Sequence, residues 1–350
     1  MFSRYFRSLL AAIWILLALV LFLIAALVAY KALQSFLHRL LHRRRSIFQP
    51  ALDRLIQGDP SSALALRPRL WGDAGLLEDL LVESFGQVSG SLREDVRTVA
   101  FNSGLIERRL RQAGSRKIHV RAEAYNRLGL LGAAKAVPML AAGLAREDYA
   151  MKIVIVRALG RIHSAEALPV LLSALGEGHG PLSRFLMHAL VDYGYEAVPG
   201  LMSLADRPGA AQADAIDLLG QLHALAALND LILTLRTAAD PNVRAAAAKA
   251  LGMLAHPDAV EVLRAGLKDG MRLVRANSAW ALGCVGDPSA CPDLAALFAD
   301  NYWWARVRAA EALVKIGPPG LDRLRRLSED ADSGNRALAR EVLAVSALKR

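Results

Sequence analysis

The sequence has few cysteines and few aromatic residues. Cys284 and Cys291 are the only cysteines in 350 residues, too few for a disulfide-stapled secreted domain, and this usage indicates a reducing compartment. We expect both thiols to be core side chains. Aromatic residues make up 6% of the chain, so a place where they cluster is informative.

Motifs that carry catalysis are also missing. The chain contains no Gly-rich phosphate loop, no nucleophile elbow and no paired-carboxylate motif. His163, His223 and His256 fall in turns, and helices that pack about 8–10 Å apart do not bring such turns together around a metal whose ligands lie near 2 Å. The sequence therefore predicts no catalytic residue, no metal ligand and no cofactor, and a protein that is not an enzyme.

Acidic residues are absent from the first 45 positions. This segment contains seven basic residues, Arg4, Arg7, Lys31, Arg39, Arg43, Arg44 and Arg45. The rest of the chain holds the other 36 basic residues and all 33 acidic ones. Because the main body is nearly neutral, a cationic face that follows phosphates is not expected, and nucleic acid is not a predicted partner.

One long hydrophobic run stands near the N-terminus. No charge occurs between Arg7 and Lys31, and these 23 residues form a helix of roughly 34 Å, enough to cross a hydrocarbon core of about 30 Å. A cleaved signal peptide is the alternative, but its apolar region is usually about 7–15 residues long. We predict a short tail at 1–7 and a transmembrane helix at 8–30.

The charges that flank this run predict its orientation. Two arginines precede it and five basic residues follow by residue 45, which places the N-terminus outside and the rest of the chain in the cytoplasm. Residues 31–45 form a basic amphipathic juxtamembrane segment, which either determines topology, the interpretation we favour, or contacts anionic headgroups. The expected location is a bacterial inner membrane, crossed once.

The region between the membrane segment and the main body is irregular in pattern. Residues 46–72 contain Pro50, Gly58, Pro60 and Pro68 and are predicted to be a linker with a short helix near 51–56. Residues 73–115 have helical patterns and are interpreted as degenerate leading helices of a repeat array that occupies 116–350, since terminal repeats are atypical.

A repeat of about 31 residues runs through the main body. Each copy has a leucine, often followed by glycine, near the end of its first predicted helix. These anchors are Leu128, Leu159, Leu190, Leu219, Leu251, Leu282, Leu313 and Leu343. Such regular spacing predicts stacked helical hairpins, each of which needs neighbours to bury its apolar faces.

Seven residues before each anchor stands a second recurring position. It holds Arg121, Lys152, Ser183, Gln212, Arg244, Arg275, Arg306 and Arg336. Acidic residues often come shortly before it, namely Asp148, Asp240, Asp269, Asp300 and Asp332. An Asp–Arg arrangement of this kind is predicted to join successive hairpins by charge-assisted hydrogen bonds as a structural ladder.

The string Val274-Arg275-Ala276 followed by Ala281-Leu282-Gly283, with its copies, resembles HEAT repeats, in particular the short subtype also found in phycobilisome lyases. The resemblance implies an all-α fold, a right-handed α-solenoid of about eight HEAT-like hairpins preceded by one transmembrane helix. Membrane-anchored bacterial proteins of this layout are similar over the whole length. The hydroxylases among HEAT-repeat proteins hold a di-iron centre with His-Glu dipeptides, and this sequence has none.

What the resemblance implies for function is a non-catalytic scaffold that binds protein partners, in some cases within cell-surface polysaccharide synthesis. The alternative is a bilin lyase or isomerase. The membrane segment and the lack of an evident bilin-binding set argue against this alternative.

Aromatic residues cluster at two turns. Tyr302, Trp303 and Trp304 lie at the turn into the seventh repeat, and Tyr193 and Tyr195 lie in the turn between the helices of the third. Buried aromatics contribute strongly to cores, which favours packing of the tryptophans over the preceding repeat. Because Trp is also enriched at interaction hot spots, all five residues remain candidate partner-binding residues.

Overall fold

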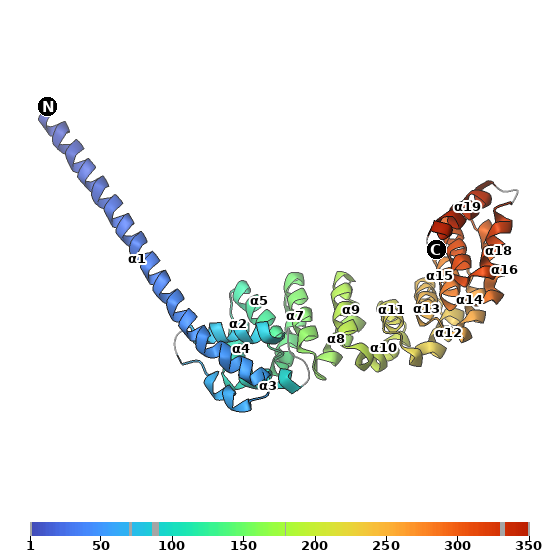
Figure 1. Cartoon of the computed structure of the whole chain (residues 1–350), viewed down its shortest axis with the longest axis horizontal. Coiled ribbons are helices and arrows are strands. Elements are labelled where there is room, and N and C mark those ends of the chain that lie inside the picture. The colour runs from blue at the N-terminus through green and yellow to red at the C-terminus, as the bar shows by residue number, and fades with distance from the viewer. Residues whose placement is uncertain (1, 70–71, 86–90, 179, 330–332, 349–350) are drawn as a thin grey trace. The chain divides into compact units, whose positions relative to one another are not determined.

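The computed structural model describes residues 2–69, 72–85, 91–178, 180–329 and 333–348, and these residues form helices, turns and loops without a strand. The chain divides into two compact units, Met1–Ala133 and Ala134–Arg350, which Figure 1 colours blue to green and green to red. Each unit is described by itself below.

The described residues of the first unit form one very long helix and four shorter ones. Its elements are α1 (Phe2–Ile56), the 3-10 helix η1 (Pro60–Ala65), α2 (Asp73–Phe85), α3 (Ser91–Asn102), α4 (Leu105–Ala113) and α5 (Ile118–Leu130). Helix α1 includes all of the described part of the predicted tail, the predicted span and the juxtamembrane segment (Figure 1). It contains one stretch long and apolar enough to cross a membrane, Leu19–Phe36, with none of that window buried in the protein.

The predicted linker at 46–72 is wrong for residues 46–50, because α1 continues through them, and the short helix predicted near 51–56 is the last part of α1, which ends at Ile56. Phe48, Leu52 and Leu55 lie on one face of this part of the helix and are buried, where α1 packs against η1, α2 and α3. Pro50 lies inside the helix, although proline is typical of the end of a helix or of a linker. The apolar spacing of four and three residues was the stronger signal, because burial of that face stabilises the helix.

Ion pairs tie the shorter helices of this unit together. Arg109 of α4 donates two hydrogen bonds of 2.7 Å to the buried carboxylate of Glu78 on α2. Arg127 of α5 donates to Asp79 on α2 at 2.6 Å. Helix α5 is the first helix of the predicted array at 116–350, and the structure places it in this unit, packed against α4.

The second unit is a stack of helical hairpins. The first helices of the hairpins are α7 (Tyr149–Ile162), α9 (Ser183–Asp192), α11 (Gln212–Gln221), α13 (Pro241–Leu254), α15 (Arg272–Val285), α17 (Trp303–Ile316) and α19 (Ser333–Leu348). The second helices are α6 (Val137–Arg146), α8 (Ala167–Gly176), α10 (Val198–Ala205), α12 (Leu228–Thr237), α14 (Val260–Gly266), α16 (Cys291–Ala296) and α18 (Pro318–Leu327). Short 3-10 turns complete the unit: η2 (Ala134–Ala136), η3 (Gly180–Leu182), η4 (Gly194–Ala197), η5 (Leu225–Ala227), η6 (Pro257–Ala259), η7 (Pro288–Ala290) and η8 (Leu297–Ala299).

Successive first helices contact one another from α7 to α19 and form one layer of the stack (Figure 1). All eight predicted leucine anchors lie in helices, and seven of them, from Leu128 to Leu313, are fully or almost fully buried. Leu343 in α19 is half-buried. The repeat register read from the sequence is therefore confirmed.

The glycine after the anchor has a steric reason. A Cβ atom on Gly283 would lie 2.6 Å from the Cα atom of Ala312, and one on Gly252 would lie 2.8 Å from the Cα atom of Ala281. Both alanines stand one position before the next anchor. Neighbouring first helices thus approach so closely that only hydrogen fits at this position.

Candidate functional site

The predicted ladder is present in full at two places. Arg244 of α13 donates to both carboxylate oxygens of Asp269 at 2.8 and 3.0 Å. Arg275 of α15 does the same to Asp300 at 2.6 and 2.9 Å. Each arginine also donates to two carbonyl groups that precede its own helix, those of Ala238 and Ala239 for Arg244.

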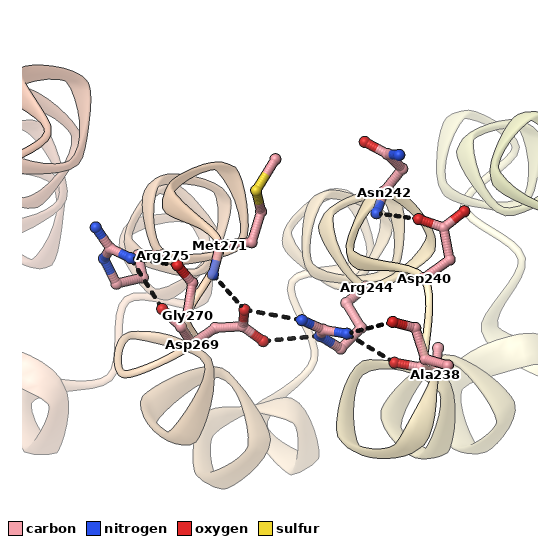
Figure 2. A network of polar contacts seen from close by, with 9 residues as sticks. Ala238, Asp240, Asn242, Arg244, Asp269, Gly270, Met271 and Arg275 are labelled. Carbon is pink, nitrogen blue, oxygen red and sulfur yellow. Dashed lines mark hydrogen bonds and ion pairs between the residues drawn. The ribbon is translucent and has the colours of Figure 1, made fainter.

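Each aspartate of these pairs also begins the next first helix. The Oδ1 atom of Asp269 accepts the backbone N–H of Met271 at 2.7 Å, as Figure 2 shows beside the Arg244 pair. The Oδ1 atom of Asp300 accepts the N–H of Tyr302 at 2.8 Å. The carboxylate is therefore shared between a guanidinium of one repeat and the helix start of the next, which fixes their mutual position.

These pairs shift the ionisation of both partners. The hydrogen bonds from Arg244 lower the pKa of the Asp269 carboxyl, although burial acts in the opposite direction. Arg275 lowers the pKa of Asp300 in the same way. The aspartates in turn raise the pKa of Arg244 and Arg275. All four groups are charged at neutral pH, so the ladder supplies cohesion and no proton donor or acceptor for catalysis.

Other members of the predicted ladder have different partners. Arg121 donates to the carbonyls of Ser115 and Arg116. Gln212, which stands where most repeats have a cation, donates to the carbonyl of Ala205 at 2.8 Å. Asp240 accepts the N–H of Asn242 as an N-cap (Figure 2). Asp332 and Arg336 lie at the end of the array, where residues 330–332 are outside the described residues.

Arg306 occupies the ladder register and also contacts an aromatic ring. Its guanidinium carbon lies 5.0 Å from the centre of the Trp303 ring. Its Nε atom is buried and has no hydrogen-bond partner in the described part of the chain. The acceptor of the two complete pairs stands six residues before the arginine of the next repeat. The corresponding residue before Arg336 is Asp330, which lies outside the described residues.

The histidines of the turns adopt the backbone conformation that ends a helix, which the sequence pattern did not predict. His163 and His223 have φ of 49°, and Ala255 at the same place in its repeat has φ of 51°. The left-handed region ends these first helices, and Gly286 occupies it in α15 with φ of 80°. Among the described residues, no group of three or more His, Cys, Asp or Glu could hold a metal ion.

Tyr193 does not lie at a surface, and its assignment as a partner-binding residue is wrong. Only 3% of the residue is exposed, its ring stacks on that of His163 at 4.3 Å, and its hydroxyl donates to the carbonyl of Ser164. Burial raises the pKa of Tyr193 to about 12. Tyr195, two residues on, is exposed and donates to the carbonyl of His223 at 3.4 Å.

The two tryptophans of the seventh repeat are exposed, contrary to the expectation that they pack over the preceding repeat. Trp303 is 46% and Trp304 is 56% exposed. Both stand in the first turn of α17, where Ala305 points into the core instead and is fully buried. The side chain of Tyr302 is half-exposed and has the guanidinium of Arg272 over its ring at 5.1 Å.

Both tryptophans line a groove between α17 and α19. The groove has a volume of about 610 Å³, and its lining consists of Trp303, Trp304, Val307, Arg308, Glu311, Val314, Lys315, Leu338, Glu341, Val342, Val345 and Ser346. Arg308 pairs with Glu311 along the helix at 2.9 Å. The lining is therefore mainly apolar with balanced charges at its rim.

The cysteines lie beside this region. Cys291 is buried and Cys284 is half-buried. Burial raises the pKa of the Cys291 thiol. Lys315 donates to the Sγ atom of Cys284 at 3.6 Å and lies 5.7 Å from the centre of the Trp280 ring. Cys291 is a core thiol as predicted, whereas Cys284 is only half-buried.

Comparison with protein families identifies the repeats. The model of HEAT repeats matches residues 106–191, 198–271, 228–314 and 267–344. Together these ranges span more than half of the 350-residue chain. The match begins within α4, so part of the region interpreted as degenerate leading helices already fits the repeat. No curated protein matches the chain.

Several solved structures are similar in fold. One is an engineered protein, 18% identical, with a TM-score of 0.39 over 85% of this chain and 98% of that chain. Another is the complex of CpcE and CpcF of phycocyanin lyase from Nostoc sp. PCC7120, 22% identical, with a TM-score of 0.33 over 68% and 94%. Human deoxyhypusine hydroxylase is 19% identical, with a TM-score of 0.31 over 86% and 97%. These low scores support no inference about function.

Proposed function

Because the chain belongs to the HEAT-repeat family, we propose that it is a non-catalytic scaffold, anchored in the bacterial inner membrane by α1, that binds a protein partner. The partner would belong to a membrane-associated assembly such as one for cell-surface polysaccharide synthesis. The array lies in the cytoplasm and the N-terminus outside. The exposed pair Trp303–Trp304 beside the groove between α17 and α19 is the observation that carries the proposal.

Exposed tryptophans need an explanation because burial of a large aromatic side chain is strongly favourable. Trp303 and Trp304 both leave about half of their surface in solvent, although most buried sites in the same helix are occupied by the smaller alanine. Tryptophan beside an apolar pocket is typical of an interaction hot spot. The balanced rim charges of the groove suit a protein segment better than a polyanion.

The tether supports the location. Leu19–Phe36 has a mean hydropathy of 2.0 and is unburied, whereas the part of α1 from Phe48 onward packs into the first unit. Helix α1 thus contains an exposed apolar segment and, after it, a segment that packs into the folded first unit. A signal sequence at the N-terminus can have the same length and apolar composition. The proposal therefore includes that α1 is retained in the mature protein.

The test is crosslinked co-purification of the full chain from membranes, compared with Trp303→Ala/Trp304→Ala. We expect a specific partner with the wild-type protein and its loss with the double variant, at nearly unchanged thermal stability. Leu273→Ala is the matched control, because this exposed apolar residue stands in the corresponding turn of α15.

Two results would contradict the proposal. One is a partner that is recovered equally with the double variant, which would place binding elsewhere on the array. The other is loss of folding in the double variant together with unchanged binding in the fraction that remains folded, which would give the tryptophans a purely structural role. An absorbance spectrum with added bilins tests the lyase alternative, and no spectral change is expected.

A further inference from the structure

The end of α4 and the turn that leads into α5 carry a group of unpaired cations. The group consists of Arg108, Arg111, Arg116 and Lys117 and is called the cationic turn below. All four residues are exposed, and none of them forms an ion pair with another described residue. The chain beyond residue 45 is nearly neutral as a whole, so this excess of positive charge is local.

The acidic residues of the neighbouring helices are already engaged elsewhere. Those of α2 and α5 form the pairs Arg109–Glu78, Arg127–Asp79 and Arg127–Glu123. Glu107 of α4 has a buried carboxylate oxygen and forms no ion pair with the cationic turn. The four cations are therefore hydrated in the protein by itself, and an external anion can approach them without displacing a carboxylate.

The corresponding turn is acidic in later repeats. Asp269 and Asp300 stand six residues before the ladder arginine of their repeats, and each accepts the backbone N–H of the residue two positions on. Six residues before Arg121 the sequence has Ser115, whose Oγ atom accepts the N–H of Lys117 at 3.2 Å. The same local contact is thus made, but a hydroxyl replaces the carboxylate and two cations follow it.

Two of these cations stand where the helix dipole disfavours them. Lys117 is the N-cap residue of α5, Arg116 precedes it, and no acidic residue occupies the first turn of the helix. The N-terminus of a helix carries a partial positive charge, which repels cations and attracts anions. By contrast, Asp148 caps α7 and Asp240 caps α13. The cations at the start of α5 do not stabilise this helix, and a bound anion would offset their repulsion.

An exposed apolar side chain lies next to these cations. Ile118 directly follows Lys117 and is 52% exposed. A surface that fits the cationic turn therefore offers negative charge with an apolar region about one side chain away. The interface of an anionic bilayer has this arrangement, because its phosphate groups lie directly above the acyl chains.

With α1 as the anchor, the fold holds the cationic turn near a membrane. Helix α4 packs against α3 and α5, and α3 packs against α1. The apolar window of α1 ends at Phe36, and the packed part of the helix begins at Phe48, twelve positions later, which is a rise of about 18 Å. The bilayer is thus the anionic surface present at the highest effective concentration for this unit, whereas an acidic protein must be recruited from solution.

We propose that the cationic turn binds anionic phospholipid headgroups of the membrane that α1 crosses, and that Ile118 enters the apolar part of the interface. The proposal rests on the membrane anchor of the proposed function and adds a second contact with the same bilayer. A single helix leaves the attached unit free to rotate about the helix axis. The second contact fixes which face of the first unit lies on the lipid.

The test is amide hydrogen exchange of the full chain in two kinds of nanodisc, one of phosphatidylcholine and one of equal parts phosphatidylcholine and phosphatidylglycerol. In the anionic nanodiscs we expect exchange of residues 115–120 to be about tenfold slower, because each cation near an anionic surface strengthens the contact by a factor of about five. The difference should disappear at high salt, where the charges are screened.

The triple variant Arg111→Gln/Arg116→Gln/Lys117→Gln should abolish the difference between the two lipids, since it removes most of the attraction to the headgroups. Ile118→Ser should reduce the difference and leave its salt dependence, because it removes the apolar contact and keeps the cations. All four residues are exposed, so both variants should fold.

The matched control is Arg207→Gln/Arg236→Gln/Lys268→Gln, which removes the same charge from exposed positions of the second unit and should leave the slower exchange unchanged. Equal exchange of the wild type in both lipids, slower exchange that persists in the first triple variant, or its loss in the control would overturn the proposal. So would stronger protection of residues 115–120 by duplex DNA or poly-glutamate in neutral nanodiscs than by phosphatidylglycerol.

The same experiment separates this proposal from the scaffold function. A chain that does not co-elute with nanodiscs contradicts the membrane anchor and the lipid contact together. A chain that co-elutes but exchanges equally in both lipids contradicts the lipid contact alone and leaves the anchored scaffold standing.

Discussion

At the scale of single residues, the same aspartate both pairs with an arginine of one hairpin and caps the first helix of the next. Asp300 binds Arg275 of one hairpin and caps the first helix of the next. Both side chains are largely buried, with 15% exposure for the arginine and 6% for the aspartate. A bidentate pair in such surroundings contributes more than a surface ion pair, and the loss of one partner leaves the other buried and uncompensated.

Arg275→Gln should therefore lower the free energy of unfolding by about 3 kcal/mol at pH 7. Because Arg275 lowers the pKa of Asp300 in the folded state, the stabilisation is present above the ordinary carboxyl pKa of about 4 and is lost as pH falls through the lower folded value. The difference between variant and wild type should shrink below pH 4. Thermal unfolding of the full chain in detergent between pH 2.5 and 7 measures it.

Arg308→Gln is the control for this prediction, since its pair with Glu311 is exposed. A change within about 0.5 kcal/mol is expected at every pH. A pH-independent loss for Arg275→Gln would show that its contribution comes from packing and the carbonyl contacts rather than from the ion pair.

Ala255 stores backbone strain at the end of α13. Its φ of 51° is unfavourable for a residue with a Cβ atom, whereas Gly286 occupies the corresponding position in α15. Ala255→Gly should raise stability by about 1 kcal/mol and Gly286→Ala should lower it by a similar amount. A Cβ atom on Gly286 would meet nothing within 4 Å, so thermal unfolding of the pair isolates the backbone effect. Equal stability of all three proteins would show that the left-handed conformation carries no cost here.

At the scale of helices, close approach of first helices sets the fit between successive repeats. Gly160, Gly220, Gly252 and Gly283 each face an alanine of the next first helix. In the third repeat Val191 stands at the glycine position, and the next helix has Leu218 where the helices that face these four glycines have alanine. Both members of the contact are larger there, so α9 and α11 cannot approach as closely as α13 and α15 do.

Gly283→Ala tests this close packing between α15 and α17. The new Cβ atom would lie 2.6 Å from the Cα atom of Ala312, so the helices must separate, and we expect a loss of about 2 kcal/mol in spite of the higher helix propensity of alanine. Gly270→Ala is the control, because nothing lies within 4 Å of its Cβ position. Hydrogen exchange of α15 and α17 amides should rise for the first variant only. Unchanged exchange in both would show that the interface tolerates a methyl group.

At the scale of the whole molecule, one part of α1 is apolar and exposed, whereas its last part is buried in the first unit. Its apolar stretch has no cover in the protein, while Phe48, Leu52 and Leu55 belong to the core of the first unit. The two parts should respond differently to truncation because one is stabilised by lipid and the other by protein packing.

Removal of residues 2–44 should release the protein from membranes as a folded, soluble chain. Removal of residues 2–56 should also take away buried side chains that contribute about 2 kcal/mol each, so the first unit loses its core and the product aggregates. Carbonate extraction followed by gel filtration distinguishes the outcomes. Retention of the shorter truncation in the membrane would contradict the assignment of α1 as the anchor.

The sequence by itself determined the helical class, the period of the repeat and the leucine anchors, because regular burial requires regular apolar spacing. Arg244–Asp269 and Arg275–Asp300 were also predictable, since residue type and register recur together. Tertiary structure alone decided that Tyr193 is buried and that Trp303 and Trp304 are exposed, because one turn can direct an aromatic ring inward or outward with the same spacing. It also decided that the Nε atom of Arg306 is buried without a hydrogen-bond partner among the described residues. Periodicity describes the units that stack, whereas the surface they present depends on contacts between side chains far apart in the chain.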